Sequence, residues 1–528
     1  MSLFENILKA VKKDEPGVAP EGLALPGSSD ATFAPGAHDH LLLYLGLKRK
    51  ADDREAALAH VEAAVRACAA QSPSPVPLLR DLDQALDLRD AVNIVDDVVE
   101  RVESLALDDW ENVYDAISAV ALSTDRPQTL KVAIALLAPF QEPETVNFFA
   151  VLARHPEFSL YACTALANDP SPAARAELVA LLDTATGWAK VDVIERLLRV
   201  EELDLAEALV TKGMENVEPL GHVVALGLAE RCGLAEALDS RDTTRDTLVG
   251  ACRILAQLAE DSASGARGGL DDYSARDRAV SAFVSRLEGG PADLEMIEAA
   301  AAVRRWSARM KPSKARRPES GARAKAGKRG KPARAPRSLT AAQIAEETAA
   351  YLDRPDVVGV VVSEVLAKQM LRRHRAARLA ARAGISDALS PLLEVLTRHP
   401  DDDAVAAAAV ALASGSELAR LRDRLATRIA PEKRTGAPEK MHALDANAKH
   451  TWQYLTLIEA LPRLPDEPSR ALLRTATRDR DPAVRRAAFR ALRALPSLEK
   501  QDREALSRAA DDPAPEIAEE AAGDPGKH

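Results

Sequence analysis

Residues 472–495 have the sequence LLRTATRDRDPAVRRAAFRALRAL, which predicts two short helices joined by a tight turn. Asp481 is a favourable N-cap, and Pro482 follows at the first helical position, where a missing N–H costs nothing. Beyond the proline, apolar residues recur at the spacing of one helical face: Val484, Ala487, Ala488, Ala491, Leu492 and Leu495. The stretch therefore predicts a helix that buries one face against a neighbour.

This stretch resembles the HEAT repeat, whose second helix opens with the pattern Asp-x-Asp-Pro-x-Val-Arg. The matching residues here are Asp479, Asp481, Pro482, Val484 and Arg485. The resemblance implies an array of stacked helical hairpins. It also implies that Arg485 bonds an aspartate, here Asp479, and makes the stack rigid. We therefore expect the repeat to be stabilised by Asp479, Asp481, Pro482 and Arg485.

The composition of the 528-residue chain favours closely packed helices. Hydrophobic residues make up 47% of the chain but aromatic residues only 3%, so the core must consist largely of Ala, Leu and Val. Such a core suits helices packed at short distances, whereas sandwiches and barrels favour β-branched and aromatic residues. We predict an all-α fold, an α-solenoid of HEAT-like helix–turn–helix repeats in two arrays joined by a disordered basic linker.

A repeat is visible in the first half of the chain. Turn-like residues are separated by 29, 32 and 31 positions: Pro127, Pro156, Trp188 and Pro219. Each precedes an apolar helical pattern, and a period near 30 is typical of an α-solenoid. The sequence VLARHP at 151–156 returns as VLTRHP at 395–400, 244 residues later. We interpret this echo as the same unit in both halves, with His155 and His399 in equivalent turns.

The sequence divides into five parts, which are predicted as follows. They are an N-terminal amphipathic segment and flexible tether at 1–37, a first HEAT-like array at 38–260, a helical extension at 261–310, a disordered basic linker at 311–338, and a second array with a terminal cap at 339–523. Ser338 or Thr340 should cap the first helix of the second array. Helices are then expected over 341–352, 357–382, 386–398, 404–413, 416–429 and 448–461.

Two segments carry strong local charge of opposite sign. Residues 81–125 hold thirteen acidic residues against Arg89 and Arg101, a local net charge of −11. Residues 311–337 hold eleven cations against Glu319, a net charge of +10, and lack apolar periodicity. The acidic block is either a solvated face or a seat for a basic partner. The basic segment is expected to be a disordered spacer with weak polyanion affinity.

Arginine stripes are the candidate binding residues. On the motif helix Arg486, Phe489, Arg490 and Arg493 recur at helical spacing, and an earlier stripe consists of Arg375, Arg378 and Arg382. Arg suits a bidentate grip on carboxylate or phosphate, and Phe would add an anchor. In HEAT arrays the second helices generally line the concave surface, so the resemblance implies a concave binding stripe. The alternative interpretation is a solvated helix face.

No catalytic or cofactor motif stands out. The chain has no GxGxxG after a strand, no GxxxxGK[ST], no HExxH and no GxSxG. His38-Asp39-His40 could be a metal pair, but alternate residues meet on one face of a strand and not of a helix. We interpret it as a helix entry. We expect no cofactor and no metal, and we predict that the protein is not an enzyme.

The N-terminal segment places Leu3, Phe4, Ile7, Leu8 and Val11 on one helical face. It is either a membrane-surface or partner-docking helix, or a cap on the first repeat, and we favour the cap. No run of about 18 apolar residues occurs, so stable membrane insertion is not expected. Four well-separated cysteines are expected to be buried hydrophobic residues in a reducing, cytoplasmic compartment.

These features predict a non-catalytic scaffold or adaptor that binds another protein. The first alternative is a nucleic-acid-associated protein that uses the basic linker and the arginine stripes. The second is a HEAT-like enzyme or cofactor lyase. The strongly acidic remainder of the chain disfavours broad wrapping of nucleic acid, because a solenoid that binds DNA should have a basic concave face.

Overall fold

A computed structural model describes residues 2–12, 15–23, 25, 34–45, 51–70, 74–86, 91–140, 142–200, 205–310, 339–436 and 450–522. Within these ranges the chain is helical, and the extended pairing consists of an isolated bridge between Thr435 and Asp479. The all-α prediction is therefore confirmed for this part of the chain. No helix in these ranges is both long enough and apolar enough to cross a membrane.

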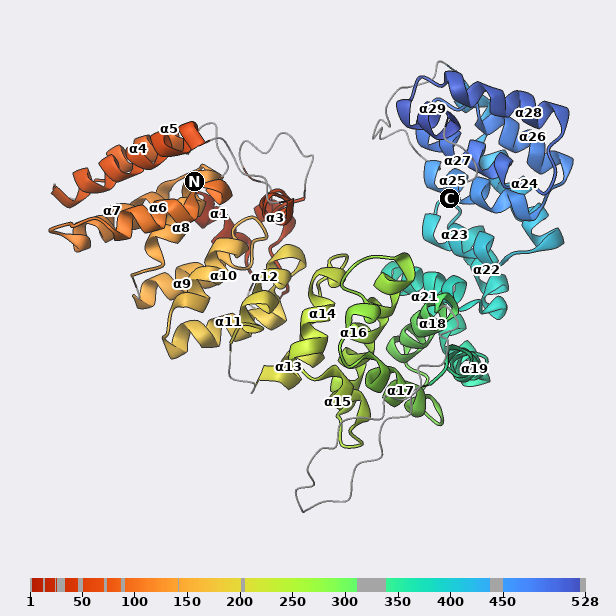
Figure 1. Ribbon diagram of the computed structural model, residues 1–528, viewed down its shortest axis with the longest axis horizontal. Coiled ribbons are helices and arrows are strands. Elements are labelled where there is room, and N and C mark those ends of the chain that lie inside the picture. The colour runs from red at the N-terminus through yellow and green to blue at the C-terminus, as the bar shows by residue number, and fades with distance from the viewer. Residues whose placement is uncertain are drawn as a thin grey trace, which may run out of the picture. The chain divides into compact units, whose positions relative to one another are not determined.

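The chain divides into two compact units (Figure 1). The first comprises residues 1–285 and 309–339, and the second comprises 286–308 and 340–528. The elements of the first unit are α1 (Leu3–Ala10), α2 (Pro20–Leu23), α3 (Ala37–Leu45), α4 (Ala51–Ala70), α5 (Pro75–Leu86), η1 (Ala91–Asn93), α6 (Val95–Glu103), α7 (Trp110–Ser123), α8 (Pro127–Leu137), α9 (Pro143–Leu152), α10 (Ser159–Asn168), α11 (Pro172–Thr184), α12 (Gly187–Leu197), α13 (Ala206–Lys212), α14 (Gly221–Arg231), α15 (Leu234–Asp239), α16 (Arg245–Ser264) and η3 (Leu270–Asp272).

Helix α17 (Arg276–Leu287) contains the boundary between the units. The elements that follow it are α18 (Leu294–Arg309), α19 (Ala341–Leu352), α20 (Pro355–Val365), α21 (Met370–Ala383), η4 (Ser386–Ala388), α22 (Leu389–Arg398), α23 (Asp403–Leu412), α24 (Gly415–Ile429), η5 (Pro431–Arg434), α25 (Thr451–Ala460), η6 (Leu461–Arg463), α26 (Glu467–Ala476), α27 (Pro482–Arg493), α28 (Lys500–Ser507), η7 (Arg508–Asp511) and α29 (Pro515–Ala522).

Alternate helices stack on one another within each unit. In the first unit α8 contacts α10, α10 contacts α12, α12 contacts α14, and α14 contacts α16, while α9, α11 and α13 form a second row. The helices α8, α10, α12 and α14 begin at or within three residues of Pro127, Pro156, Trp188 and Pro219, the turn-like residues of the sequence repeat. In the second unit α21, α23, α25 and α27 form the corresponding row. Figure 1 shows α10 and α12 side by side in the first unit.

The N-terminal segment packs on the first unit. Leu3 and Ile7 of α1 are buried, Phe4 packs on Phe148 with ring centroids 4.8 Å apart, and α1 contacts α7 and α9. Further along, the N–H of Gly17 donates to the carbonyl oxygen of Thr184 at 2.6 Å. The described part of the expected tether is therefore tied to the helices by backbone hydrogen bonds.

The two helices that flank the basic segment both belong largely to the second unit. Arg375 of α21 forms ion pairs with Glu295 and Glu298 of α18, and the Tyr351 hydroxyl of α19 donates to the carbonyl oxygen of Pro291 at 2.6 Å. The predicted helical extension at 261–310 is thus shared between the two units. The segment at 311–338 lies outside the described residues.

One predicted helix is two helices in the structure. The prediction of a single helix over 357–382 was wrong, because a turn at 366–369 separates α20 from α21. Arg373 Nη1 donates to the carbonyl oxygen of Ala367 at 3.4 Å within this turn. The break allows α21 to contact both α20 and α23. By contrast, α19 spans the predicted residues, and Thr340 caps it in a reciprocal box with Gln343.

Candidate functional site

Helix α27 begins at the Asp481-Pro482 motif, as the sequence predicted. The Asp481 carboxylate accepts the N–H of Ala483 at 2.9 Å, and Pro482 occupies the first turn. Val484, Ala488 and Leu492 on one face are fully buried. Because a helix repeats every 3.6 residues, this packing turns Arg486, Ala487 and Arg490 toward another side. The local sequence therefore presents a mixed arginine–alanine face.

That face forms one wall of a cavity of about 780 Å³, here called the α27 groove. Helix α25 supplies Leu455 and Glu459, and the start of α29 supplies Pro515 and Glu516. The α27 wall contains small side chains between its arginines: Ala483, Ala487, Ala491 and Ala494. The groove thus combines an apolar floor with arginines of α27 and carboxylates of α25 and α29.

Three arginines of α27 converge on Glu520 of α29. Arg486 Nε and Arg490 Nε donate to its carboxylate at 2.8 and 2.6 Å, and Arg493 Nη1 reaches its backbone oxygen at 3.5 Å. The hydrogen bonds from Arg490 and then Arg486 lower the pKa of the Glu520 carboxyl to about 2. The carboxylate therefore stays ionised at neutral pH and offsets part of the positive charge of the predicted stripe from within the chain.

Phe489 does not belong to the groove. It is 3% exposed and packs with Ala509, Ala514 and Ile517 in a small core under the last helix. Although it lies three residues from Arg486, the rotation of the helix turns it toward α29 and η7. The prediction that Phe489 is an exposed anchor was wrong, and its role is to hold the terminal helix in place.

The carboxylate that pairs with Arg485 is that of Asp512, and not that of Asp479 as expected. Its Nε and Nη2 atoms donate to the Asp512 carboxylate, both at 2.8 Å, and its Nη1 donates to the backbone oxygens of Asp479 and Arg480. The Asp479 carboxylate instead accepts Arg434 Nε at 2.7 Å. Asp512 is the residue 33 positions after Asp479. Each of these two aspartates therefore forms an ion pair with an arginine that precedes it in the chain. The pairs join segments that are distant in the sequence.

The residues of the second predicted stripe, on α21, differ in their exposure. Arg375 donates to the carboxylates of Glu295 at 3.0 Å and Glu298 at 2.8 Å, so it ties α21 to α18. Arg378 and Arg382 are exposed on the same helix. The α21 and α27 stripes lie on helices of one row, separated by α23 and α25.

Trp452 is an exposed residue that was not among the predicted site residues. This residue is 70% exposed at the start of α25 and lies three residues before Leu455 and seven before Glu459, which both line the α27 groove. Helical spacing places these three residues on one face. An exposed tryptophan is unusual because its large apolar surface is normally covered. The pattern Trp452, Leu455, Glu459 was the available signal.

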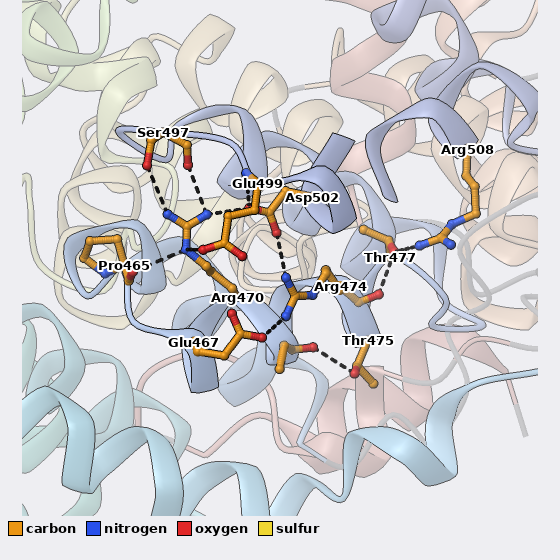
Figure 2. A network of polar contacts seen from close by, with 11 residues as sticks. Pro465, Glu467, Arg470, Arg474, Thr475, Thr477, Ser497, Glu499, Asp502 and Arg508 are labelled. Carbon is orange, nitrogen blue, oxygen red and sulfur yellow. Dashed lines mark hydrogen bonds and ion pairs between the residues drawn. The ribbon is translucent and has the colours of Figure 1, made fainter. Parts of the chain in front are cut away.

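A buried aspartate holds the neighbouring helices together (Figure 2). Asp502 is fully buried, accepts Arg474 Nη1 at 3.0 Å and also accepts Arg470 Nη1. Its carboxylate accepts the N–H of Glu499 at 3.0 Å as well. These contacts saturate the carboxylate and join α26 to α28. Asp502 is thus a structural group, and sequence spacing gave no sign of it.

The first unit contains a buried polar network around α3. His38, Asp39 and His40 lie in the first turn of this helix, as predicted for a helix entry. Asp39 forms an ion pair with Lys131 Nζ at 2.7 Å, whereas His40 Nε2 lies 2.8 Å from Asp192 Oδ1. The neighbouring side chains therefore turn to different partners. Within the described segments, no three His, Cys, Asp or Glu side chains are grouped as metal ligands would be.

No protein-family model matches the chain, and no curated protein matches it. Among solved structures, one match is the crystal structure of an engineered protein of the Northeast Structural Genomics Consortium. It is 15% identical and has a TM-score of 0.28, over 83% of this chain and 100% of that one. This likeness supports no inference about the function of the chain.

Proposed function

We propose that the protein is a non-catalytic scaffold of HEAT-like repeats that binds another protein through the α27 groove. The observation that carries this proposal is the open cavity of about 780 Å³ with its arginines, alanine floor and adjacent exposed Trp452. Protein interfaces favour such a combination, because Trp and Arg supply large contacts and directed hydrogen bonds.

The HEAT-like assignment rests on the stacking of alternate helices and on the Arg–Asp pairs between layers. Arg373 of α21 with Asp402 and Arg485 of α27 with Asp512 place the same chemistry on two helices of one row, and Arg434 of η5 pairs with Asp479, which precedes α27. Repetition of one contact along a stack is what a solenoid requires. The two rows of helices in the first unit and the row α21, α23, α25 and α27 in the second agree with this assignment.

The partner surface is proposed to be acidic. Arg486 and Arg490 hold the Glu520 carboxylate through Nε and Nη2 atoms, and a partner carboxylate offers the same acceptor geometry. Nucleic acid is a weaker candidate because the whole chain carries a net charge of −11 and would repel a long polyanion, whereas a partner carboxylate needs only to replace Glu520 on these two arginines. Any polyanion affinity is assigned to 311–337.

The experiment is affinity capture from an extract of the native host, quantified by mass spectrometry, with three forms of the full-length chain. These are the wild type, Arg486→Gln/Arg490→Gln, and the control Lys500→Gln/Arg503→Gln, which removes two cations from exposed positions on α28. We expect a specific set of proteins to be lost with the groove variant alone and to resist competition by duplex DNA.

Two results would count against the scaffold proposal. Equal loss in both double variants would show non-specific charge attraction. Tight binding of the wild type to duplex DNA at physiological salt would favour the nucleic-acid alternative. A parallel capture with Trp452→Ser tests whether the exposed ring on α25 takes part in binding, since it removes the ring without changing the charge.

A further inference from the structure

A second groove lies in the first unit, between α6, α8, α10 and α12. Its volume is about 630 Å³, within the range of sites that accept ligand or peptide side chains. Apolar side chains contribute much of its lining, among them Leu43, Val95, Val99 and Leu160. Leu43 is 51% exposed at its edge. This cavity, here called the α6 groove, is independent of the α27 groove.

The α6 groove has an acidic edge. Asp96, Glu100 and Glu103 line it and are exposed, and they lie on one face of α6 at positions i, i+4 and i+7. No side chain in the described ranges forms an ion pair with any of these three carboxylates. Arg196 of α12 is the cation among the lining residues. The lining therefore carries a net charge of −2.

The charges on the other side of α6 are all matched. Asp97 forms an ion pair with Arg54 of α4, and Arg101 pairs with Glu55 at 2.9 Å and Glu62 at 3.3 Å on the same helix. Thus α6 has one face whose charges are neutralised by packing and one whose carboxylates border an apolar groove. Surplus charge beside an apolar groove indicates the charge of what binds there.

We propose that the α6 groove binds a basic amphipathic helix of a partner protein. Apolar side chains of that helix would enter the groove, and Lys or Arg side chains at helical spacing would meet Asp96, Glu100 and Glu103. Amphipathic helices bind apolar grooves in this way, with anchors at i, i+3, i+4 and i+7. The negative edge selects a cationic helix over a neutral or acidic one.

The chain's own basic segment fits this groove poorly. Residues 311–337 carry eleven cations, but their apolar residues are Ala and Pro, with no Leu, Ile, Val, Met or aromatic residue. Such a segment could neutralise the edge but could not fill the apolar floor. The floor therefore favours a partner helix with large apolar side chains.

The test uses a fluorescein-labelled peptide of Leu and Lys at helical spacing, about 18 residues or five turns long. Its binding to the full-length protein is measured by fluorescence anisotropy. Two matched peptides replace every Lys by Glu or every Leu by Ala. We expect the Leu/Lys peptide to bind, with affinity that falls as salt rises, and both matched peptides to bind at least tenfold more weakly. Equal binding of the Ala/Lys peptide would overturn the proposal, because the apolar floor would then contribute nothing.

Variants locate the peptide on the protein. Asp96→Asn/Glu100→Gln/Glu103→Gln should weaken binding about tenfold, the ratio expected when three exposed ion pairs are lost together. The control Asp108→Asn/Glu111→Gln/Asp115→Asn removes three exposed carboxylates of the same acidic block that do not line the groove. It should leave the affinity within about twofold. Equal losses in the two triple variants would reduce the effect to bulk charge and overturn the proposal.

Two further variants complete the test. The first tests the apolar floor separately from the acidic edge, and the second distinguishes a partner helix from the chain's own basic segment. Ala135 lines the groove on α8 and is half-buried, so Ala135→Phe should occupy the cavity, leave the fold intact and weaken binding although every carboxylate remains. Deletion of 311–337 should leave the peptide affinity unchanged. A marked rise in affinity on deletion would show that this segment occupies the groove, and would overturn the proposal of a partner helix.

Discussion

At the scale of single residues, a buried ion pair connects neighbouring helices of the second unit. The side chains of Arg485 and Asp512 are 2% and 5% exposed, and the pair is bidentate. A buried pair contributes little over a well-packed apolar pair, but the loss of one member leaves an uncompensated charge in the interior. We expect such pairs to specify which helix layers meet more than they add to stability.

We predict that Asp512→Ala lowers the free energy of unfolding of the second unit by about 3–5 kcal/mol, because it leaves the buried Arg485 guanidinium without its carboxylate partner. Glu520→Gln is the matched control, since its partners Arg486 and Arg490 are partly exposed and such pairs contribute about 1 kcal/mol or less. Urea denaturation followed by circular dichroism measures both. Similar losses in the two variants would contradict the distinction between buried and exposed pairs.

His155 makes the first unit sensitive to acid. Its Nε2 lies 3.1 Å from the carbonyl oxygen of Gly22, and its Nδ1 lies 3.1 Å from the N–H of Glu157. A carbonyl only accepts and an N–H only donates, so the neutral ring with its proton on Nε2 satisfies both contacts. Burial lowers the pKa of His155 to about 4, and protonation of Nδ1 would also break the contact with Glu157.

Because the folded-state pKa lies below the ordinary value of 6.5, the contribution of His155 is present above pH 6.5 and is lost as the pH falls toward 4. We predict a loss of the order of 3 kcal/mol across this window, from about 1.4 kcal/mol for each unit of pKa shift. Thermal melting between pH 7 and 4 measures it. In His155→Gln, which cannot titrate, the melting temperature should fall less steeply over the same window. Identical slopes would refute the assignment to His155.

At the scale of elements, α27 separates a buried face from a groove face within one short helix. Ala488 is fully buried, whereas Arg490 two residues later is exposed. We predict that Ala488→Glu destabilises the second unit by several kcal/mol, because it buries a charge without a partner. Arg490→Glu should change the melting temperature only slightly. Comparable melting temperatures for the two variants would mean that the faces are assigned wrongly.

Helix α1 is also an element whose surroundings decide its role. Its apolar face is the one that a membrane-surface helix would use, but Leu3 and Ile7 of that face are covered by the first unit. We predict that Ile7→Asp lowers the melting temperature of the first unit. We also expect the wild-type protein not to co-sediment with vesicles of anionic phospholipid. Co-sedimentation abolished by Ile7→Asp, without a change in melting temperature, would restore the membrane interpretation.

At the scale of the whole molecule, the position of α18 changes what cleavage of the basic segment should produce. Trypsin is expected to cut first within 311–337, which carries eleven cations and lacks apolar periodicity. Helices α18 and α19 on either side both pack in the second unit, partly through Arg375 with Glu295 and Glu298. We therefore predict that the two fragments stay associated and co-elute on gel filtration. Separate elution would show that the segment joins two independent arrays.

The sequence by itself determined the features that depend on neighbours in the chain. Composition and period indicated an all-α fold, and Asp481 with Pro482 marked the start of α27. The buried face of that helix, with Val484, Ala488 and Leu492, also followed from its spacing. These signals are local, because caps form within one turn and amphipathic faces repeat every few residues.

Only the tertiary structure decided which distant groups meet. Arg485 pairs with Asp512, Phe489 lies in the terminal core, and Glu520 forms ion pairs with Arg486 and Arg490. The burial of Asp502, the docking of α1 and the packing of α18 in the second unit are of the same kind. Each depends on the rotation and separation of helices that are remote in sequence. Periodicity shows which face of a helix is apolar, but the partner of a polar side chain is set only when another helix is placed against it.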